Sequence, residues 1–498
     1  MTSSTFVLLG ILLSSFITGS VIFFLREDQH RLRTGLNLAG AVLKILFVVV
    51  LLRGVLAGQT FDLSFTMAPG VVVALGADAN SVLFVSLSSV LWFFTTLYAV
   101  GYLEDSPRRS RFFGFFSLCV TSTVGIALAA NLVTFLIFYE LLTISTFPLV
   151  VHRGTRKALA AGRVYLAYTV GGGTLLLFAV AWLQSISGPI TFTERGALGE
   201  SVASHPTQLT LIFFVFIAAL GVKSALVPLH GWLPRAMVAP APVSALLHAV
   251  AVVKAGAFGI VRLVYDVYGI ETAEQLGVLR PLAVLAGFTI VYGSVRALFQ
   301  DDLKKRLAFS TVSQVSYITL GTAIFGPVAT LGGIVHLVHQ GIMKITLFFA
   351  AGNYAETLGI HRVSEMNGVG RRMPWTTAAF TVGALGMIGI PPLAGFVSKL
   401  YLKQGAIAAG QSWVVLVLAA SSLLNAAYFL PILYRSWFLP APEAWPNARD
   451  FGRFETHWML LLPPLFTAAA VVLAGVFADS NLSPLAWARI IAGREYGP

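Results

Sequence analysis

Long apolar segments separated by short polar ones recur along the whole chain. A helix needs about 20 mostly apolar residues to cross a bilayer, and on that rule the sequence predicts about fourteen membrane-spanning helices. Their approximate limits are 5–25, 36–57, 80–103, 112–128, 131–151, 160–185, 207–229, 240–265, 278–299, 306–325, 328–352, 374–402, 412–436 and 457–478. We therefore expect an all-α, polytopic membrane protein.

The polar segments between these helices alternate in charge. Segments after the odd-numbered helices are basic, as at residues 108–111 and 304–306, whereas the intervening ones carry mainly acidic residues such as Asp62, Asp78 and Asp266. Lys and Arg collect in cytoplasmic loops of membrane proteins. The pattern predicts a multi-pass protein of the plasma (inner) membrane of a prokaryote, with both termini on the outer side.

Composition agrees with a membrane location. Hydrophobic residues make up 57% of the 498 residues and charged residues only 11%, whereas soluble domains carry about 25%. The net charge of +12 lies in the short loops, so it indicates topology rather than a nucleic-acid partner. Cys119 is the single cysteine, which excludes an internal disulfide and a cysteine-based metal cluster. The sequence predicts no metal site and no cofactor site.

The seventh and twelfth predicted helices share an unusual design. Each combines glycine, proline and one lysine, with Lys223 before Pro228 in the seventh and Lys399 after the Pro391–Pro392 pair in the twelfth. Proline breaks a helix, and a break at membrane depth is tolerated only in a protein interior or beside a cavity. A matched pair of broken helices indicates a transporter built from inverted repeats.

Five ionisable residues lie inside apolar helices, where each costs about 2.5–3.5 kcal/mol. They are Glu140, Lys223, Lys254, Lys344 and Lys399. Uncompensated, the five would cost about 12–17 kcal/mol, comparable to a whole folding free energy of about 5–15 kcal/mol. We therefore expect these residues to be paired or hydrated and to serve a function.

Their chemistry suits proton transfer. Desolvation and a nearby carboxylate act on a buried lysine in opposite directions, so moving the carboxylate switches the lysine between binding and releasing a proton. Glu140 beside Lys223 is the expected pair. Histidine titrates near neutrality and passes protons onward. His248 and His336 are the candidates, with His230 and His339 as accessory ones. The alternative is that the lysines reach toward an interface and the histidines only pack.

Several motifs support a family resemblance. They occupy residues 138–141, 223–235, 239–248, 253–256, 301–314, 336–344 and 391–399. Together they resemble the antiporter-like proton-translocating subunits of respiratory complex I, of Mrp sodium/proton antiporters and of membrane-bound hydrogenases. The resemblance covers about residues 80–440, and the lysine at 399 and the short C-terminal segment are most similar to the D-type subunits of Mrp antiporters.

This resemblance implies two inverted five-helix units, helices 4–8 and 9–13, within one membrane domain. The expected divisions of the chain are residues 1–110 for helices 1–3, 111–266 and 277–437 for the two repeats, and 457–498 for helix 14 and a tail. It also implies that the buried Glu140 and lysines form the proton path.

The expected function is that of a transporter subunit, with no enzyme activity of its own. It would exchange sodium ions for protons together with other membrane subunits. Two alternatives remain at this point: a proton-pumping subunit of a complex I-like or hydrogenase-type redox complex, and a membrane partner of a proton-driven inorganic-carbon uptake complex.

Overall fold

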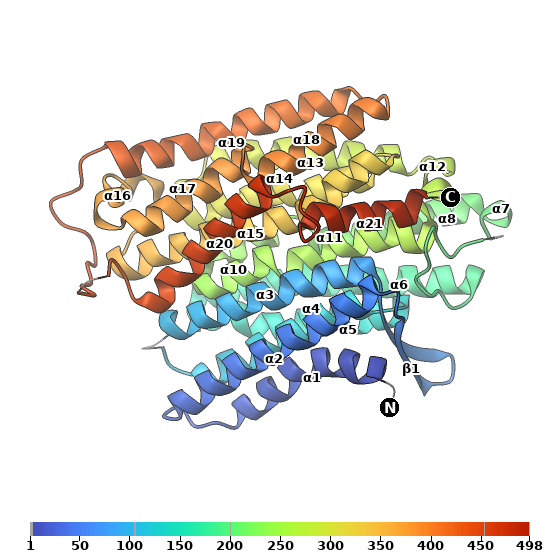
Figure 1. Cartoon of the computed structure of the whole chain (residues 1–498), viewed down its shortest axis with the longest axis horizontal. Helices are drawn as coiled ribbons and strands as arrows, with labels where there is room; N and C mark the ends of the chain where they lie inside the picture. The colour runs from blue at the N-terminus through green and yellow to red at the C-terminus, as the bar shows by residue number, and fades with distance from the viewer. Residues whose placement is uncertain (1–2, 104–105, 200, 453, 498) are drawn as a thin grey trace.

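A computed structural model of the chain describes residues 3–103, 106–199, 201–452 and 454–497. The structure is a bundle of helices that run roughly along its long axis, with a small hairpin at one end (Figure 1). The N- and C-terminal ends lie at the same end of the long axis (Figure 1). An even number of membrane crossings would produce this placement.

The first part of the chain lies along one edge of the bundle. Its elements are α1 (Ser3–Phe23), α2 (His30–Leu56), β1 (Phe61–Ala68), β2 (Val71–Ala77) and α3 (Ala79–Tyr102). The two strands pair antiparallel, with Phe61 opposite Ala77. The all-α prediction is confirmed for the rest of the chain but missed this hairpin, which lies between two predicted helices in a segment that we interpreted as an acidic loop.

The next part forms the near-centre of the bundle. Its elements are α4 (Arg109–Leu128), α5 (Leu132–Val150), α6 (Arg156–Ser187), α7 (Ser201–Ser204), α8 (Pro206–Lys223), α9 (Trp232–Arg235), η1 (Ala236–Val238), α10 (Ala241–Ala249), α11 (Val252–Arg262), the π-helical η2 (Leu263–Tyr268) and α12 (Ile270–Gln275).

The remaining part completes the bundle. Its elements are α13 (Leu279–Leu298), α14 (Leu303–Thr322), α15 (Pro327–Leu358), η3 (Val363–Glu365), α16 (Val369–Arg372), α17 (Pro374–Ile388), α18 (Ala394–Ala408), α19 (Trp413–Phe438), α20 (Trp458–Val476) and α21 (Pro484–Tyr496). The helix α21 corrects the expectation of a plain C-terminal tail.

Twelve helices of the described chain are long and apolar enough to cross a membrane, counting α10 to η2 as one. The more polar α14 and the broken pair α17–α18 occupy the other two segments that the sequence predicted as spans. The polytopic helical architecture is confirmed, while the count of fourteen and the inverted repeats stay predictions.

Local chemistry explains where many helices begin. The side chains of Asp78, Asn131, Thr155 and Asp302 each accept a hydrogen bond from a backbone N–H in the first turn of α3, α5, α6 and α14 respectively. Such caps satisfy backbone donors that the helix itself leaves open.

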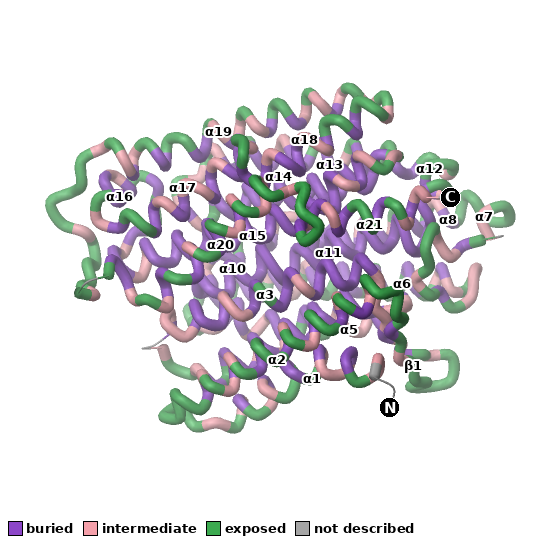
Figure 2. Tube along the Cα trace, in the orientation of Figure 1, coloured by how far each residue is buried: buried purple, intermediate pink, exposed green. Residues whose placement is uncertain are grey.

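The core of the bundle is formed by α10, α11, α14 and α15, which are buried along almost their whole length (Figure 2). Helix α15 packs against α10, α14, α17, α18, α20 and α21. The helices at the two edges of the bundle, α2 and α19, differ from this core because they expose large apolar side chains. The exposed fractions include 58% for Leu46, 73% for Leu416 and 74% for Leu423. Apolar surface of this extent fits contact with lipid or with neighbouring membrane proteins.

Both predicted helix breaks are present. Helix α8 ends at Lys223, and the chain stays irregular until α9 begins at Trp232. Helix α17 ends at Ile388, where Gly389 (φ 96°) provides the left-handed conformation that terminates helices, and α18 begins at Ala394. A third break, between Ala249 and Val252, separates α10 from α11 and was not predicted.

Candidate functional site

The end of α8 places Lys223 against α5. Lys223 is fully buried, donates a hydrogen bond to the backbone carbonyl of Tyr139, and lies 3.5 Å from the centroid of the Tyr139 ring. Backbone dipole and aromatic face together stabilise the ammonium group. The cation is therefore held at a helix break, where the free carbonyls of a C-terminus also favour positive charge.

Glu140 follows Tyr139 on α5 and is half-buried. Its charge and that of Lys223 act on each other, yet the two side chains form no ion pair among those of the described chain. The Glu140 Oε1 atom is buried and has no hydrogen-bond partner among the described residues. Lys223 thus binds the carbonyl of the residue that precedes Glu140, an arrangement in which a small movement of Glu140 changes the field at Lys223.

The position of Glu140 depends on Gly173 of α6. A β-carbon at Gly173 would overlap the carboxyl oxygens of Glu140, whereas one at Gly171, two residues away, would meet nothing within 4 Å. We expect Gly173→Ala to fold, because the flexible carboxyl end can move, at a stability cost of about 1–3 kcal/mol for overpacking. Displacement of the carboxylate is expected to lower the rate of proton transport about tenfold, part of the about 10²–10⁴-fold that a well-positioned acid–base group contributes. Gly171→Ala is the matched control, and equal rates in the two variants would contradict this role of Glu140.

Buried titratable groups continue from Lys223 onto α11. We call the line of such groups that begins at Glu140 and Lys223 and ends at Lys399 the belt. A β-carbon at Gly256 would overlap the backbone N of Ser224, so α11 passes directly against the end of α8. Lys254, which lies half a turn before Gly256 on α11, is fully buried. It donates a hydrogen bond to the backbone carbonyl of Leu337 on α15, at 2.6 Å. Lys254 therefore bridges the first broken helix and α15.

Helix α15 carries three of the predicted residues. His336 Nδ1 lies 2.8 Å from Ser398 Oγ, its ring stacks on Tyr317, and its charged neighbours are Lys254 and Lys399. Lys344, two turns further on, binds Leu307 O at 3.2 Å and the Ser310 hydroxyl. The helix thus presents titratable groups toward both halves of the chain.

Two of the histidines have both ring nitrogens open. His248 on α10 and His339 on α15 are fully buried, and neither ring has a hydrogen-bond partner among the described residues. His248 stacks on Phe348, 4.5 Å between centroids, and its charged neighbours are Lys344 and Lys304. Open nitrogens beside lysines suit proton acceptance and donation. His230 is half-buried beside Tyr292 and lies outside this belt.

Lys399 closes the belt at the second broken helix. Its Nζ atom donates to the last carbonyls of α17, Met387 O and Ile388 O, both at 2.9 Å, and to Ser422 Oγ at 3.1 Å. A cation at a helix C-terminus is stabilised by the helix dipole. Lys223 and Lys399 therefore share a setting: each is a buried lysine at a helix break that binds backbone carbonyls.

The belt as a whole runs from α5 through α8, α11 and α15 to α18. None of its four lysines, Lys223, Lys254, Lys344 and Lys399, forms a salt bridge within the described chain, and each donates to at least one backbone carbonyl. Neutral dipoles hold a lysine without fixing its charge, so such a group can exist in both protonation states. The arrangement is suited to passing protons along the plane of the membrane.

The comparisons with known proteins decide the family. Residues 129–425, more than half of the chain, match the family described as NADH:quinone oxidoreductase/Mrp antiporter, TM. The chain belongs to this family. The matched region of this NADH:quinone oxidoreductase/Mrp antiporter family includes every candidate proton-transfer residue named above.

Individual members of the NADH:quinone oxidoreductase/Mrp antiporter family are similar over most of the chain. NADH-quinone oxidoreductase subunit N of Desulforudis audaxviator is 35% identical over 78% of this chain and 78% of that protein. The D-type Na(+)/H(+) antiporter subunit of Alkalihalophilus pseudofirmus is 27% identical over 94% of this chain and 93% of that protein. The fold is similar to a chain of the Mrp complex from Dietzia sp. DQ12-45-1b, with a TM-score of 0.86, 24% identity and coverage of 100% and 98% of the two chains.

Two charged features of this family member were missed at the level of sequence. Lys44 on α2 is fully buried, binds Ser15 Oγ at 2.7 Å and lies 5.2 Å from the Trp92 ring. A lone lysine inside an apolar segment is the same signal that revealed Lys223, so it could have been found. The second feature is an ionic cluster around Arg262, whose partners are too far apart in sequence to be connected without a structure.

Proposed function

We propose that this chain is the proton-translocating subunit of a multisubunit sodium/proton antiporter. Protons move along Glu140, Lys223, Lys254, His248, His336, Lys344 and Lys399, with His339 and His230 as accessory groups. The observation that carries the proposal is the continuity of the belt: a buried lysine at one helix break connects through α11 and α15 to a buried lysine at the other.

The two broken helices supply the switching elements. Lys223 lies at the end of α8 and binds the Tyr139 carbonyl, and Lys399 binds the last carbonyls of α17. A change in the charge of either lysine therefore alters the forces on the backbone beside a helix break. Residues 111–266 and 277–437 form the two repeats in this proposal, with the break at Lys223 in the first and the break before Lys399 in the second. Gating is then a local rearrangement of each repeat, as in transporters built from inverted repeats.

The assembly consists of further membrane subunits, as the names of similar proteins indicate for those proteins. The apolar edges at α2 and α19 offer surfaces for such neighbours as well as for lipid. In the plasma membrane of a prokaryote the basic loops face the cytoplasm, so the end of the bundle that carries both termini faces outward.

A second candidate function is a proton pump driven by a redox reaction in partner subunits. The identity of 35% with an NADH-quinone oxidoreductase subunit favours it, since this exceeds the 27% with the D-type antiporter subunit. The belt within this chain would act in the same way, and the two candidates differ in the energy source.

The deciding experiment uses inverted vesicles from cells that produce the whole assembly, with a pH-sensitive dye. An antiporter gives sodium-dependent proton movement that Lys223→Ala abolishes. A redox pump gives no response to sodium but acidifies the vesicle interior when a reduced electron donor is added. Sodium-dependent movement that is unchanged in Lys223→Ala would reject this chain as the proton path.

A further inference from the structure

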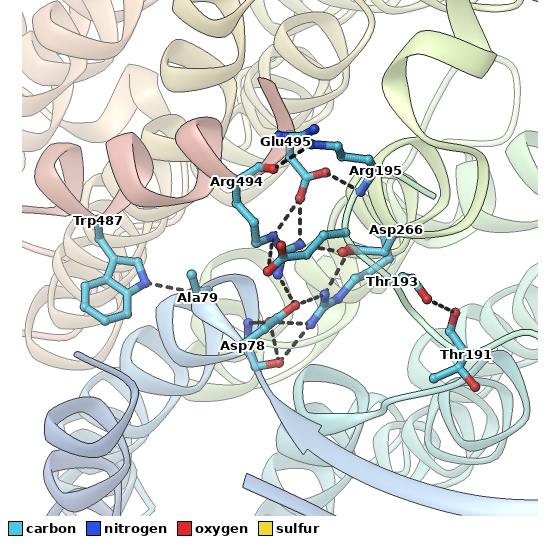
Figure 3. A network of polar contacts seen from close by, with 12 residues as sticks. Asp78, Ala79, Thr191, Thr193, Arg195, Asp266, Trp487, Arg494 and Glu495 are labelled. Atoms are coloured by element: carbon cyan, nitrogen blue, oxygen red, sulfur yellow. Dashed lines mark hydrogen bonds and ion pairs between the residues drawn. The ribbon is translucent and has the colours of Figure 1, made fainter. Parts of the chain in front are cut away.

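An ionic cluster joins four segments at the end of the bundle where the chain begins and ends. Arg494 of α21 binds Asp78 Oδ2 and Asp266 Oδ1, each at 2.5 Å, and Arg262 of α11 binds Asp78 at 2.5 Å and Asp266 at 2.9 Å. Glu495 binds Arg494 at 2.7 Å. Figure 3 shows Asp78, Asp266, Arg494 and Glu495 pointing toward one another.

The charges of the cluster do not balance. Three carboxylates, Asp78, Asp266 and Glu495, directly contact two guanidinium groups, and at the exposed rim Glu194 and Arg195 add one charge of each sign. The Asp266 side chain is 1% exposed and that of Glu495 is 0% exposed. An excess negative charge among buried groups is unfavourable. One bound proton restores neutrality, so the cluster is a proton-binding site by charge count.

The carboxyl groups differ in how firmly they hold a proton. Burial opposes ionisation of Asp78, but the guanidinium groups of Arg262 and Arg494 outweigh it and keep the pKa of that carboxyl well below its usual range. Burial raises the pKa of Glu495 against the opposing charge of Arg494, and the nearby Asp266 raises it further. Asp266 and Glu495, the two least exposed carboxyl groups of the cluster, are therefore the ones that favour a bound proton. The Nε atom of Arg262, also buried, has no partner among the described residues and so leaves a donor open for a shifted carboxylate.

The cluster connects inward to Lys254 along a single helix. Lys254, Phe258 and Arg262 are spaced four residues apart on α11 and share one side of it, which places Arg262 about 12 Å from Lys254 along the axis. Phe258 lies between them, with its ring 4.8 Å from that of Phe84 on α3. These two rings lie beside the segment of α11 that joins the belt to the cluster.

The cluster also connects outward. Exposure rises from the Asp266 side chain, at 1%, to Asp78, at 30%, and Glu194, at 65%. We propose that protons pass between the relay and the aqueous phase at this end of the molecule through the Asp266–Glu495 half of the cluster, with Arg262 and Arg494 positioning the carboxyl groups. This inference rests on the proposed function and adds the exit that the belt of lysines lacks.

The test measures sodium- or donor-driven proton movement in vesicles that contain the whole assembly, for Asp266→Asn and Glu495→Gln. Both changes keep the shape and remove the ability to exchange a proton. We expect each to lower the rate at least about 100-fold, the lower end of what a positioned acid–base group contributes, and to flatten its pH dependence. Glu495→Asp, which restores a carboxyl group, is expected to recover the pH dependence.

The matched control addresses a purely structural role. Trp487→Phe removes a polar anchor of α21 outside the cluster, the hydrogen bond from Trp487 Nε1 to Ala79 O at 2.7 Å, and leaves the carboxyl groups intact. We expect its rate to stay within twofold of the wild-type rate. An equal loss in this control, or wild-type rates and pH profiles in the two carboxyl variants, would overturn the inference. Lys223→Ala, measured in parallel, distinguishes failure of this inference from failure of the proposed function. If Lys223→Ala abolishes transport while the carboxyl variants do not, the proposed exit through the cluster is wrong and the proposed function stands.

Discussion

Replacing Lys223 with alanine is expected to reduce proton transport about 100-fold or more, since a positioned acid–base group contributes about 10²–10⁴-fold. The lysine is fully buried at the end of α8 and bound to the carbonyl of Tyr139, between Glu140 and the segment of α11 that carries Lys254. Removing it leaves no titratable group to connect the two. The measurement is dye-monitored proton movement in vesicles, together with the amount of assembled complex.

Lys44→Ala is the matched control for this variant. Lys44 is also fully buried, but it binds a serine hydroxyl on α1 and lies over Trp92, away from the belt. Loss of a buried lysine costs packing and solvation at both sites, so general damage would affect the two variants alike. We expect Lys44→Ala to keep at least about half of the wild-type rate, as is typical of a change outside a catalytic group. Abolished transport in both would indicate damage to the fold and not a relay.

Much of the architecture was predictable because the bilayer imposes a simple rule. Apolar segments of sufficient length must become helices, since no water satisfies their backbone groups. Breaks at Pro228 and at the Pro391–Pro392 pair followed from the missing donor of proline. The break between α10 and α11 has no such local cause. It occurs in a run of Ala and Val against α15, where Gly341 lies close to the Ala249 carbonyl, and it depends on tertiary packing.

The candidate site was predictable in its members but not in its contacts. An ionisable residue in an apolar segment is visible in the sequence, which is why the lysines of the belt could be named. Lys223 binds the carbonyl of Tyr139 and not the carboxylate of Glu140. This choice depends on the rotation of each helix about its axis, which sequence periodicity does not fix to within a fraction of a turn. The ionic cluster joins Asp78 to Arg494, which are 416 positions apart in the sequence. No local sequence pattern predicts such an ion pair.

Replacing Lys399 with alanine is the second change with a large expected effect. Its ammonium group binds Met387 O, Ile388 O and Ser422 Oγ and lies 5.5 Å from the Tyr317 ring, on which His336 stacks. Without it, the proton that reaches His336 has no acceptor at the second helix break. We expect proton transport to fall about 100-fold or more, on the same acid–base scale as for Lys223, while the complex still assembles.

Lys403 provides the control on the same helix. It lies one turn beyond Lys399 on α18 but is exposed, so Lys403→Ala removes an equal charge from the same segment without touching the belt. We expect transport in this variant to equal that of the wild type. If Lys399→Ala and Lys403→Ala lost transport equally, the charge of α18 as a whole and not the buried group at its break would control transport. If both kept the wild-type rate, Lys399 would lie outside the proton path. A loss confined to Lys399→Ala, matched by the loss in Lys223→Ala, would mean that both broken helices must carry a proton-binding lysine for the belt to conduct.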